Sequence, residues 1–205
     1  VGARLIGDRR VMGVMFTGST EVARILQRTI AGRLDAAGRP IPLVAETGGQ
    51  NAMIVDSSAL VEQVVGDAVA SAFDSAGQRC SALRVLCVQE EAADRVVEML
   101  QGAMGELRMG NPGALRVDVG PVIDSEARAS IAAHIDALRA SGHRVFQQCR
   151  SDAEELTHGT FVPPTLIELK HIGELQREVF GPVLHLVRYA RNDLDPLLDQ
   201  INATG

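Results

Sequence analysis

The sequence lacks the features that mark several common classes of protein. Its net charge is −6 over 205 residues, so it has no basic excess with which to bind nucleic acid or an anionic membrane surface. No apolar run approaches the roughly 18–20 residues that a membrane-spanning helix needs. No signal peptide opens the chain. We therefore expect a soluble cytoplasmic protein, with neither nucleic acid nor membrane as a partner of this segment.

Metal-binding patterns are absent as well. The three cysteines, Cys80, Cys87 and Cys149, form no CxxC pair, and their odd number fits a reducing cytoplasm. The five histidines show neither HxxE nor HExxH spacing. We interpret all five as surface or core residues and expect no metal site. Apolar residues make up 46% of the chain, which is enough to bury a sizeable core.

Short apolar runs alternate with helical patterns along the chain. This alternation predicts an α/β fold with parallel strands, and we expect the first two strands to be buried. Strands are predicted at 11–16, 41–46, 51–56, 83–89, 143–148, 162–169 and 183–190, and helices at 21–34, 60–73, 92–104, 126–140 and 194–203.

The first motif is "FTGST", residues 16–20, where a strand enters a helix through a glycine turn. Such a turn leaves unpaired backbone N–H groups at the start of the helix, which can bind a phosphate. Ser19 or Thr20 can cap the helix or contact the phosphate. A capped helix without a ligand is the alternative. Neither GxGxxG nor GxxxxGK[ST] is present, so the two commonest nucleotide loops are excluded.

The second motif is "AETGGQN", residues 45–51. Glu46 ends a predicted strand, and Gly48 and Gly49 allow a ligand to approach the backbone closely. Ligands of α/β sheets bind at the carboxyl ends of the strands, where this carboxylate lies. A solvated glutamate at a strand end is the alternative.

The third motif is "GQRC", residues 77–80, which places Cys80 in a loop rather than in the core. A cysteine nucleophile needs access and thiolate character. If the reaction passes through an acyl-cysteine, a base must activate the water that releases it, and Glu46 is the candidate. The alternative is a loop cysteine without function. Cys87 lies within a predicted strand, and we expect it to fill the core.

The fourth motif is "REVFGPV", residues 177–183. Glu178 precedes a Phe-Gly-Pro turn that opens a predicted strand. A carboxylate in this place can accept hydrogen bonds from a ribose diol. An ordinary turn is the alternative.

In this order, "FTGST", "ETGGQN", "GQRC" and "EVFGP" resemble the cofactor loop, general-base, nucleophile and ribose-binding motifs of the aldehyde dehydrogenase superfamily. The amino-acid sequence around these motifs is most similar to the L-glutamate γ-semialdehyde (1-pyrroline-5-carboxylate) dehydrogenase module of bacterial bifunctional enzymes of proline catabolism. Gln50 and the serine after Cys80 favour this branch. The resemblance implies the aldehyde dehydrogenase fold and an enzyme that uses NAD. FAD is implied only for the proline dehydrogenase half of such bifunctional enzymes.

The resemblance also implies a role for each motif residue. Cys80 would be the nucleophile and Glu46 the general base, while Ser81 would help to hold the α-carboxylate of the substrate. The remaining residues would contact the cofactor: Thr17, Gly18 and Ser19 at the pyrophosphate, Thr47, Gly48 and Gly49 at the nicotinamide, and Glu178 with Phe180 at the nicotinamide ribose.

The same resemblance divides the chain. We expect residues 1–48 to be the C-terminal part of an NAD-binding domain and residues 49–205 to be a truncated catalytic domain. The chain begins with Val1 instead of methionine and reads as a segment of something longer. The family's oxyanion-hole asparagine, substrate-anchoring loop and oligomerisation flap have no counterpart in it. We expect the 205 residues alone to be inactive, and the complete protein to be a homo-oligomer.

Three other functions compete with this one. A relative could pass its thioester to coenzyme A or phosphate, although such a transfer does not require the base Glu46. A non-catalytic homologue would need neither Cys80 nor Glu46. A cysteine hydrolase would need a histidine near Cys80, and the sequence places none there convincingly.

Overall fold

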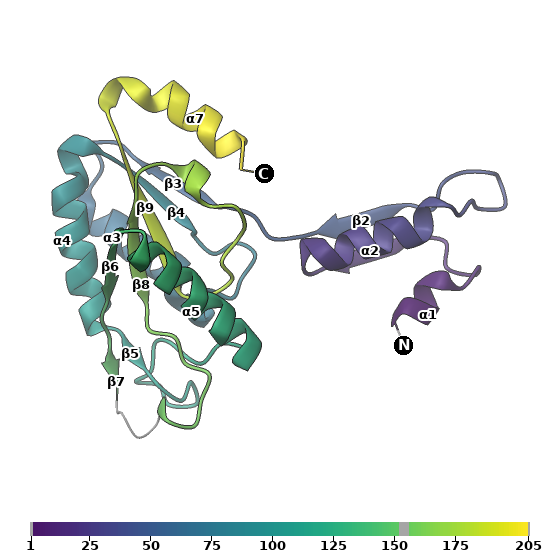
Figure 1. Cartoon of the computed structure of the whole chain (residues 1–205), viewed down its shortest axis with the longest axis horizontal. Helices are drawn as coiled ribbons and strands as arrows, with labels where there is room; N and C mark the ends of the chain where they lie inside the picture. Colours follow the sequence, from purple (N-terminus) through teal and green to yellow (C-terminus); the bar gives the residue numbers. More distant parts are fainter. Residues whose placement is uncertain (1, 152–155, 205) are drawn as a thin grey trace. The chain divides into compact units, whose positions relative to one another are not determined.

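The computed structural model describes residues 2–151 and 156–204. The chain divides between Gly48 and Gly49 into two compact units, which we call unit 1 and unit 2 (Figure 1). Each unit has its own β-structure, with β1 and β2 in unit 1 and the remaining described strands in unit 2. Among the described residues, no helix combines the length and the apolar character needed to cross a membrane.

Unit 1 is a two-stranded parallel sheet with two helices. Its elements are α1 (Gly2–Gly7), β1 (Val14–Thr17), α2 (Thr20–Ala31) and β2 (Leu43–Glu46). The predicted burial of both strands is wrong for one face. Met15 and Val44 are register partners, and they are 87% and 53% exposed. The reason is that α2 packs its Ile30 against Val14 on the opposite face only.

Unit 2 contains a five-stranded sheet in the order β3-β4-β9-β8-β6. The first four strands run parallel, and β4 is buried along its whole length, as expected for a strand with both faces covered. The strands are β3 (Ala52–Val55), β4 (Val85–Gln89), β6 (Arg144–Gln147), β8 (Thr165–Leu169) and β9 (Val183–Tyr189), and a separate parallel pair is formed by β5 (Arg108–Met109) and β7 (Arg150–Ser151).

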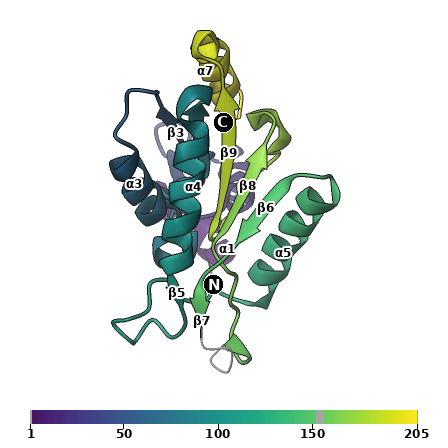
Figure 2. The same ribbon diagram turned by 90° about the vertical axis from the view of Figure 1, so that its left-hand side faces the viewer.

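Helices cover both faces of this sheet (Figures 1 and 2). Two residues on opposite faces of β9 show the arrangement: Arg188 pairs with Asp94 of α4, whereas His185 contacts His134 of α5. Helix α3 packs beside α4. The helices are α3 (Val61–Phe73), α4 (Glu90–Glu106), α5 (Ser125–Ala140) and α7 (Leu194–Asn202), with short 3₁₀ turns η1 (Asp74–Gly77), η2 (Ile172–Glu174) and η3 (Arg191–Asp193).

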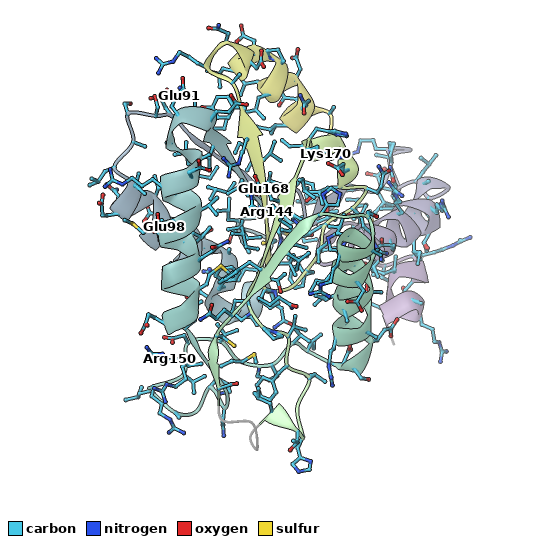
Figure 3. All side chains as sticks on the ribbon, turned by 60° about the vertical axis from the view of Figure 1, so that its left-hand side comes forward. Glu91, Glu98, Arg144, Arg150, Glu168 and Lys170 are labelled. Carbon is cyan, nitrogen blue, oxygen red and sulfur yellow. The ribbon has the colours of Figure 1, made fainter. Side chains whose placement is uncertain are left out.

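Strand β6 departs from the all-parallel expectation, because it runs antiparallel to β8 at the edge of the sheet. Arg144 and Glu168, which face each other in this register, form an ion pair at 3.1 Å (Figure 3). Cross-strand pairs of opposite charge favour one register over its neighbours.

Candidate active site

Cys80 lies in an exposed turn. The N–H of Ala82 donates to the carbonyl of Arg79 at 3.0 Å, which leaves Cys80 and Ser81 at the two central positions, both exposed. The chain enters this turn through Ser75, Ala76 and Gly77, whose φ angles of 56°, 53° and 64° are all left-handed. This conformation costs an ordinary L-residue about 1–2 kcal/mol. Such strain persists only where the surrounding contacts hold it.

Asn51 holds the Cys80 turn from behind. Its side-chain amide Nδ2 donates to the carbonyls of Cys80 and Ala82 at 2.7 and 2.9 Å. The main-chain carbonyl of Asn51 accepts from the backbone N–H groups of Arg84 and Val85. The last residue of the "ETGGQN" motif thus fixes the backbone of the nucleophile motif, which the sequence did not reveal.

Arg84 is the main residue that the sequence analysis missed. Its side chain is 1% exposed, and it forms an ion pair with Glu178 at 2.8 Å. The guanidinium also donates to the carbonyls of Gly77, Arg79 and Gly181. Burial lowers the pKa of Arg84, and its hydrogen bonds to Glu178 act in the opposite direction. A signal was available, since an arginine that opens an apolar strand needs a buried anion.

The nucleophile and ribose motifs are in direct contact. A Cβ built on Gly77 would lie 2.2 Å from the carbonyl oxygen of Gly181, so only glycine fits there. Gly181 in turn packs against α5, because a Cβ built on it would lie 2.4 Å from Cδ1 of Ile131. Phe180 is 44% exposed, with the guanidinium of Arg84 5.2 Å from its ring centroid. The structure therefore brings Cys80, Ser81, Glu178 and Phe180 onto one framework within unit 2.

Gln78 links the Cys80 loop to the segment before α5. Its Oε1 accepts from the N–H of Ile123 at 2.8 Å, and its Nε2 donates to the carbonyl of Pro121 at 3.3 Å. The next residue, Asp124, caps α5 by accepting from Ala127. The nucleophile motif and residues 121–123, which lead into α5, are therefore held together by one side chain.

The other predicted site residues belong to unit 1 or to the junction. Thr17 and Glu46 are register partners at the carboxyl ends of β1 and β2, and the N–H of Gly18 donates to the carbonyl of Glu46 at 3.1 Å. Thr17, Gly18 and Glu46 are exposed. Ser19 caps α2 by accepting from Val22 at 3.3 Å. The cofactor loop and the candidate base thus share one edge of this sheet.

Thr47, Gly48 and Gly49 lie at the junction and are half-buried. They follow Glu46 directly and lead into β3. The predicted meeting of Glu46 with Cys80 involves both units, and it stays a prediction.

The other cysteines differ sharply from Cys80. Cys87 is fully buried in β4, and burial raises its pKa to about 12, which fits its expected role as a core residue. Burial also raises the pKa of Cys149. A thiol nucleophile reacts as the thiolate, so both are poor candidates. Among residues 2–151 and 156–204, no group of three His, Cys, Asp or Glu side chains is placed to hold a metal ion.

Two histidines interact in a way that spacing did not predict. The Nε2 atoms of His134 and His185 lie 2.9 Å apart, and Nδ1 of His185 is 3.1 Å from the carbonyl of Arg84. A carbonyl only accepts, so His185 carries its proton on Nδ1 and accepts from His134. Burial lowers the pKa of His185 to about 3. His185 thus supports the backbone of Arg84 as a neutral group.

Comparison with known proteins identifies the family. The aldehyde dehydrogenase family model matches residues 1–205, and the chain belongs to that family. It is 69% identical over 208 residues to the bifunctional protein PutA of Klebsiella aerogenes and to that of Escherichia coli K12. It is 60% identical over 206 residues to the PutA of Rhizobium meliloti. The matches cover 100% of this chain but only 16–17% of these relatives.

Solved structures give the same result. A mutant of proline utilization A (PutA) from Bradyrhizobium japonicum has a TM-score of 0.91 and 48% identity, covering 100% of this chain and 20% of that one. A betaine aldehyde dehydrogenase double mutant from Staphylococcus aureus, in complex with NAD⁺ and with a BME-modified cysteine, has a TM-score of 0.86 and 28% identity over 98% of this chain and 40% of that one. The predicted α/β aldehyde dehydrogenase fold is confirmed.

Proposed function

We propose that this chain forms part of an NAD-dependent L-glutamate γ-semialdehyde dehydrogenase, which produces L-glutamate in the second step of proline catabolism. The observation that carries the proposal is the exposed Cys80 turn and its link to Glu178. Arg84 makes this link, because it pairs with Glu178 and donates to the carbonyl of Arg79. Membership of the aldehyde dehydrogenase family and the similarity to PutA proteins support it. The cysteine and glutamate motifs are the parts that a thioester mechanism with hydrolysis requires.

The residues present fit NAD⁺. Arg84 forms its ion pair with Oε1 of Glu178, and the side chain of Glu178 is 17% exposed. Its other carboxylate oxygen can therefore accept hydrogen bonds from the ribose diol. Within unit 1, Thr17 and Gly18 lead into the capped N-terminus of α2, which favours a pyrophosphate. Thr47, Gly48 and Gly49 would lie beside the nicotinamide. We infer that FAD has no place in this segment.

In the proposed mechanism, the thiolate of Cys80 attacks the aldehyde carbon and forms a thiohemiacetal. The backbone N–H of Cys80 helps to stabilise the oxyanion, while Ser81 holds the α-carboxylate of the substrate. NAD⁺, when bound, would supply the hydride acceptor. Loss of the hydride would convert the thiohemiacetal on Cys80 into a thioester. Glu46 then removes a proton from water, and the oxygen of this water attacks the thioester carbon. The thioester bond breaks, which releases L-glutamate and restores the thiol of Cys80.

The experiment measures NADH formation by the natural full-length protein with L-glutamate γ-semialdehyde. Cys80→Ala should abolish it, because a free aldehyde is a poor hydride donor. Cys149→Ala is the matched control and should retain activity, since that thiol lies outside the site. NADH formation by Cys80→Ala at the wild-type rate would refute the proposal. If product analysis found an acyl-coenzyme A in place of glutamate, the thioester would be transferred to coenzyme A and not hydrolysed.

A further inference from the structure

We propose that Arg84 is a positioning residue, which fixes the carboxylate of Glu178 relative to the Cys80 turn. Arg84 would touch neither substrate nor cofactor, and it would act through Glu178 and through the loop backbone. This inference rests on the proposed function, in which Glu178 binds the nicotinamide ribose and Cys80 is the nucleophile.

The guanidinium of Arg84 uses its full capacity for hydrogen bonding. A guanidinium has five N–H donors in a fixed plane. Arg84 donates from Nε and Nη2 to Glu178 at 3.0 and 2.8 Å, from Nη1 to Gly77 and Gly181 at 2.7 and 3.2 Å, and from Nη2 to Arg79 at 3.0 Å. These five bonds match the five donors, so a lysine with three donors on one atom cannot replace them.

The bonds to Glu178 are asymmetric in a way that suits a ligand. Both reach Oε1. Within residues 2–151 and 156–204, no hydrogen bond to Oε2 is present. One oxygen therefore anchors the carboxylate while the other keeps its lone pairs for an incoming diol. A carboxylate held this way is oriented before the nucleotide arrives, which reduces the entropy lost on binding.

The remaining partners of Arg84 explain why this is more than a buried ion pair. Gly77 and Arg79 belong to the nucleophile motif, and Gly181 follows Glu178 in the ribose motif. Each of these acceptors of the guanidinium thus lies in one of the two motifs. The backbone of Arg84 is fixed as well, since His185 donates to its carbonyl from the main-chain N–H at 2.9 Å. Moving Arg84 would shift both motifs together.

The test compares Arg84→Lys with Arg188→Lys in the natural full-length protein. Arg188 is the matched control, because it also forms ion pairs, with Glu168 and Asp94, but contacts neither motif. The Kd of NAD⁺ is measured by calorimetry, and melting temperatures are measured for both variants. We expect Arg84→Lys to raise the Kd by about tenfold or more, since each lost charge-assisted bond is worth roughly that factor. Arg188→Lys should leave it within about twofold.

Two further variants show through which residue Arg84 acts. Glu178→Gln should weaken NAD⁺ binding, and its combination with Arg84→Lys should weaken it by less than the product of the single effects. Glu178→Asp should also weaken binding about tenfold, because Arg84 would hold the shorter carboxylate away from the ribose. This variant keeps Arg84 and therefore tests the proposal even if Arg84→Lys fails to fold.

The outcomes separate this inference from the proposed function. A lower melting temperature of Arg84→Lys with unchanged NAD⁺ affinity would make Arg84 a structural brace and overturn the inference. Wild-type affinity in Glu178→Asp, together with weakened binding in Glu178→Gln, would also overturn it. Unchanged affinity in Glu178→Gln would instead refute the ribose role of Glu178 in the proposed function.

Discussion

Gly77→Ala should destabilise unit 2 strongly, because two independent costs meet at this residue. Its φ is +64°, and the left-handed conformation costs alanine about 1–2 kcal/mol. The new Cβ would lie 2.2 Å from the oxygen of Gly181 and 2.8 Å from that of Ala72. Both neighbours are backbone, so a side chain cannot simply rotate away, and overpacking of this kind costs about 1–3 kcal/mol. The two costs together come to about 2–5 kcal/mol.

The assay is urea-dependent hydrogen exchange of the buried β4 amides in the natural protein, which reports the free energy of opening this sheet. Gly66→Ala is the control. Gly66 lies on the exposed side of α3, and a Cβ added to it would meet nothing within 4 Å, so alanine should stabilise the helix by about 0.5–1 kcal/mol. A Gly77→Ala protein with wild-type protection of β4 would refute the reasoning that the two motifs touch through Gly77.

Three further outcomes are expected. Glu178→Ala should lower NADH formation in a single turnover more than it weakens binding of the semialdehyde, and unchanged NADH formation would count against its ribose role. Ser19→Ala should destabilise α2 by about 1 kcal/mol, whereas Ser19→Asn should keep the cap; wild-type protection of the α2 amides in Ser19→Ala would argue against the cap. Burial holds the pKa of His185 at about 3, while an unfolded histidine titrates near 6.5, so only the unfolded state gains a proton as the pH falls below about 6.5. Between pH 7.5 and 5.5, wild type should therefore lose about 1.4 kcal/mol more stability than His185→Gln in thermal melts, and parallel losses would contradict this.

Local periodicity was enough to predict the main helices and the strands of the five-stranded sheet in unit 2. The helical spacing of residues 92–104 predicts that Val96, Val97, Leu100 and Met104 share a buried face, and α4 buries all four. The helical pattern of residues 60–73 also predicts Leu60 on the buried stripe of α3, and this is wrong, because Leu60 precedes the first helical turn and is exposed.

Features that depend on long-range contacts escaped the sequence analysis. The antiparallel direction of β6 follows from its pairing with β8, and an apolar run carries no sign of direction. The short pair β5 and β7 joins segments about forty residues apart, and two residues give no periodicity. The left-handed conformation of Ser75 and Ala76 has no local signal in the sequence, since neither residue type favours it.

The candidate site shows the same division. Cys80, Glu46 and Glu178 were found because their motifs are local in sequence. Asn51 acts through the backbone carbonyl of Cys80, and no local pattern marks it. Arg84 is marked only by its place at the start of an apolar strand, which does not reveal partners as much as 97 positions away. The sequence therefore predicts groups that react or bind, while the groups that hold them in place become visible only in three dimensions.

The most direct test of the proposed chemistry is rapid mixing of the full-length Glu46→Gln protein with L-glutamate γ-semialdehyde and NAD⁺. If Cys80 forms the thioester and Glu46 activates only the water that releases it, a burst of about one NADH per site should precede slow turnover. Steady-state turnover at the wild-type rate would remove Glu46 from the mechanism. Absence of a burst, with acylation as slow as turnover, would contradict separate roles and place Glu46 at the activation of the Cys80 thiol.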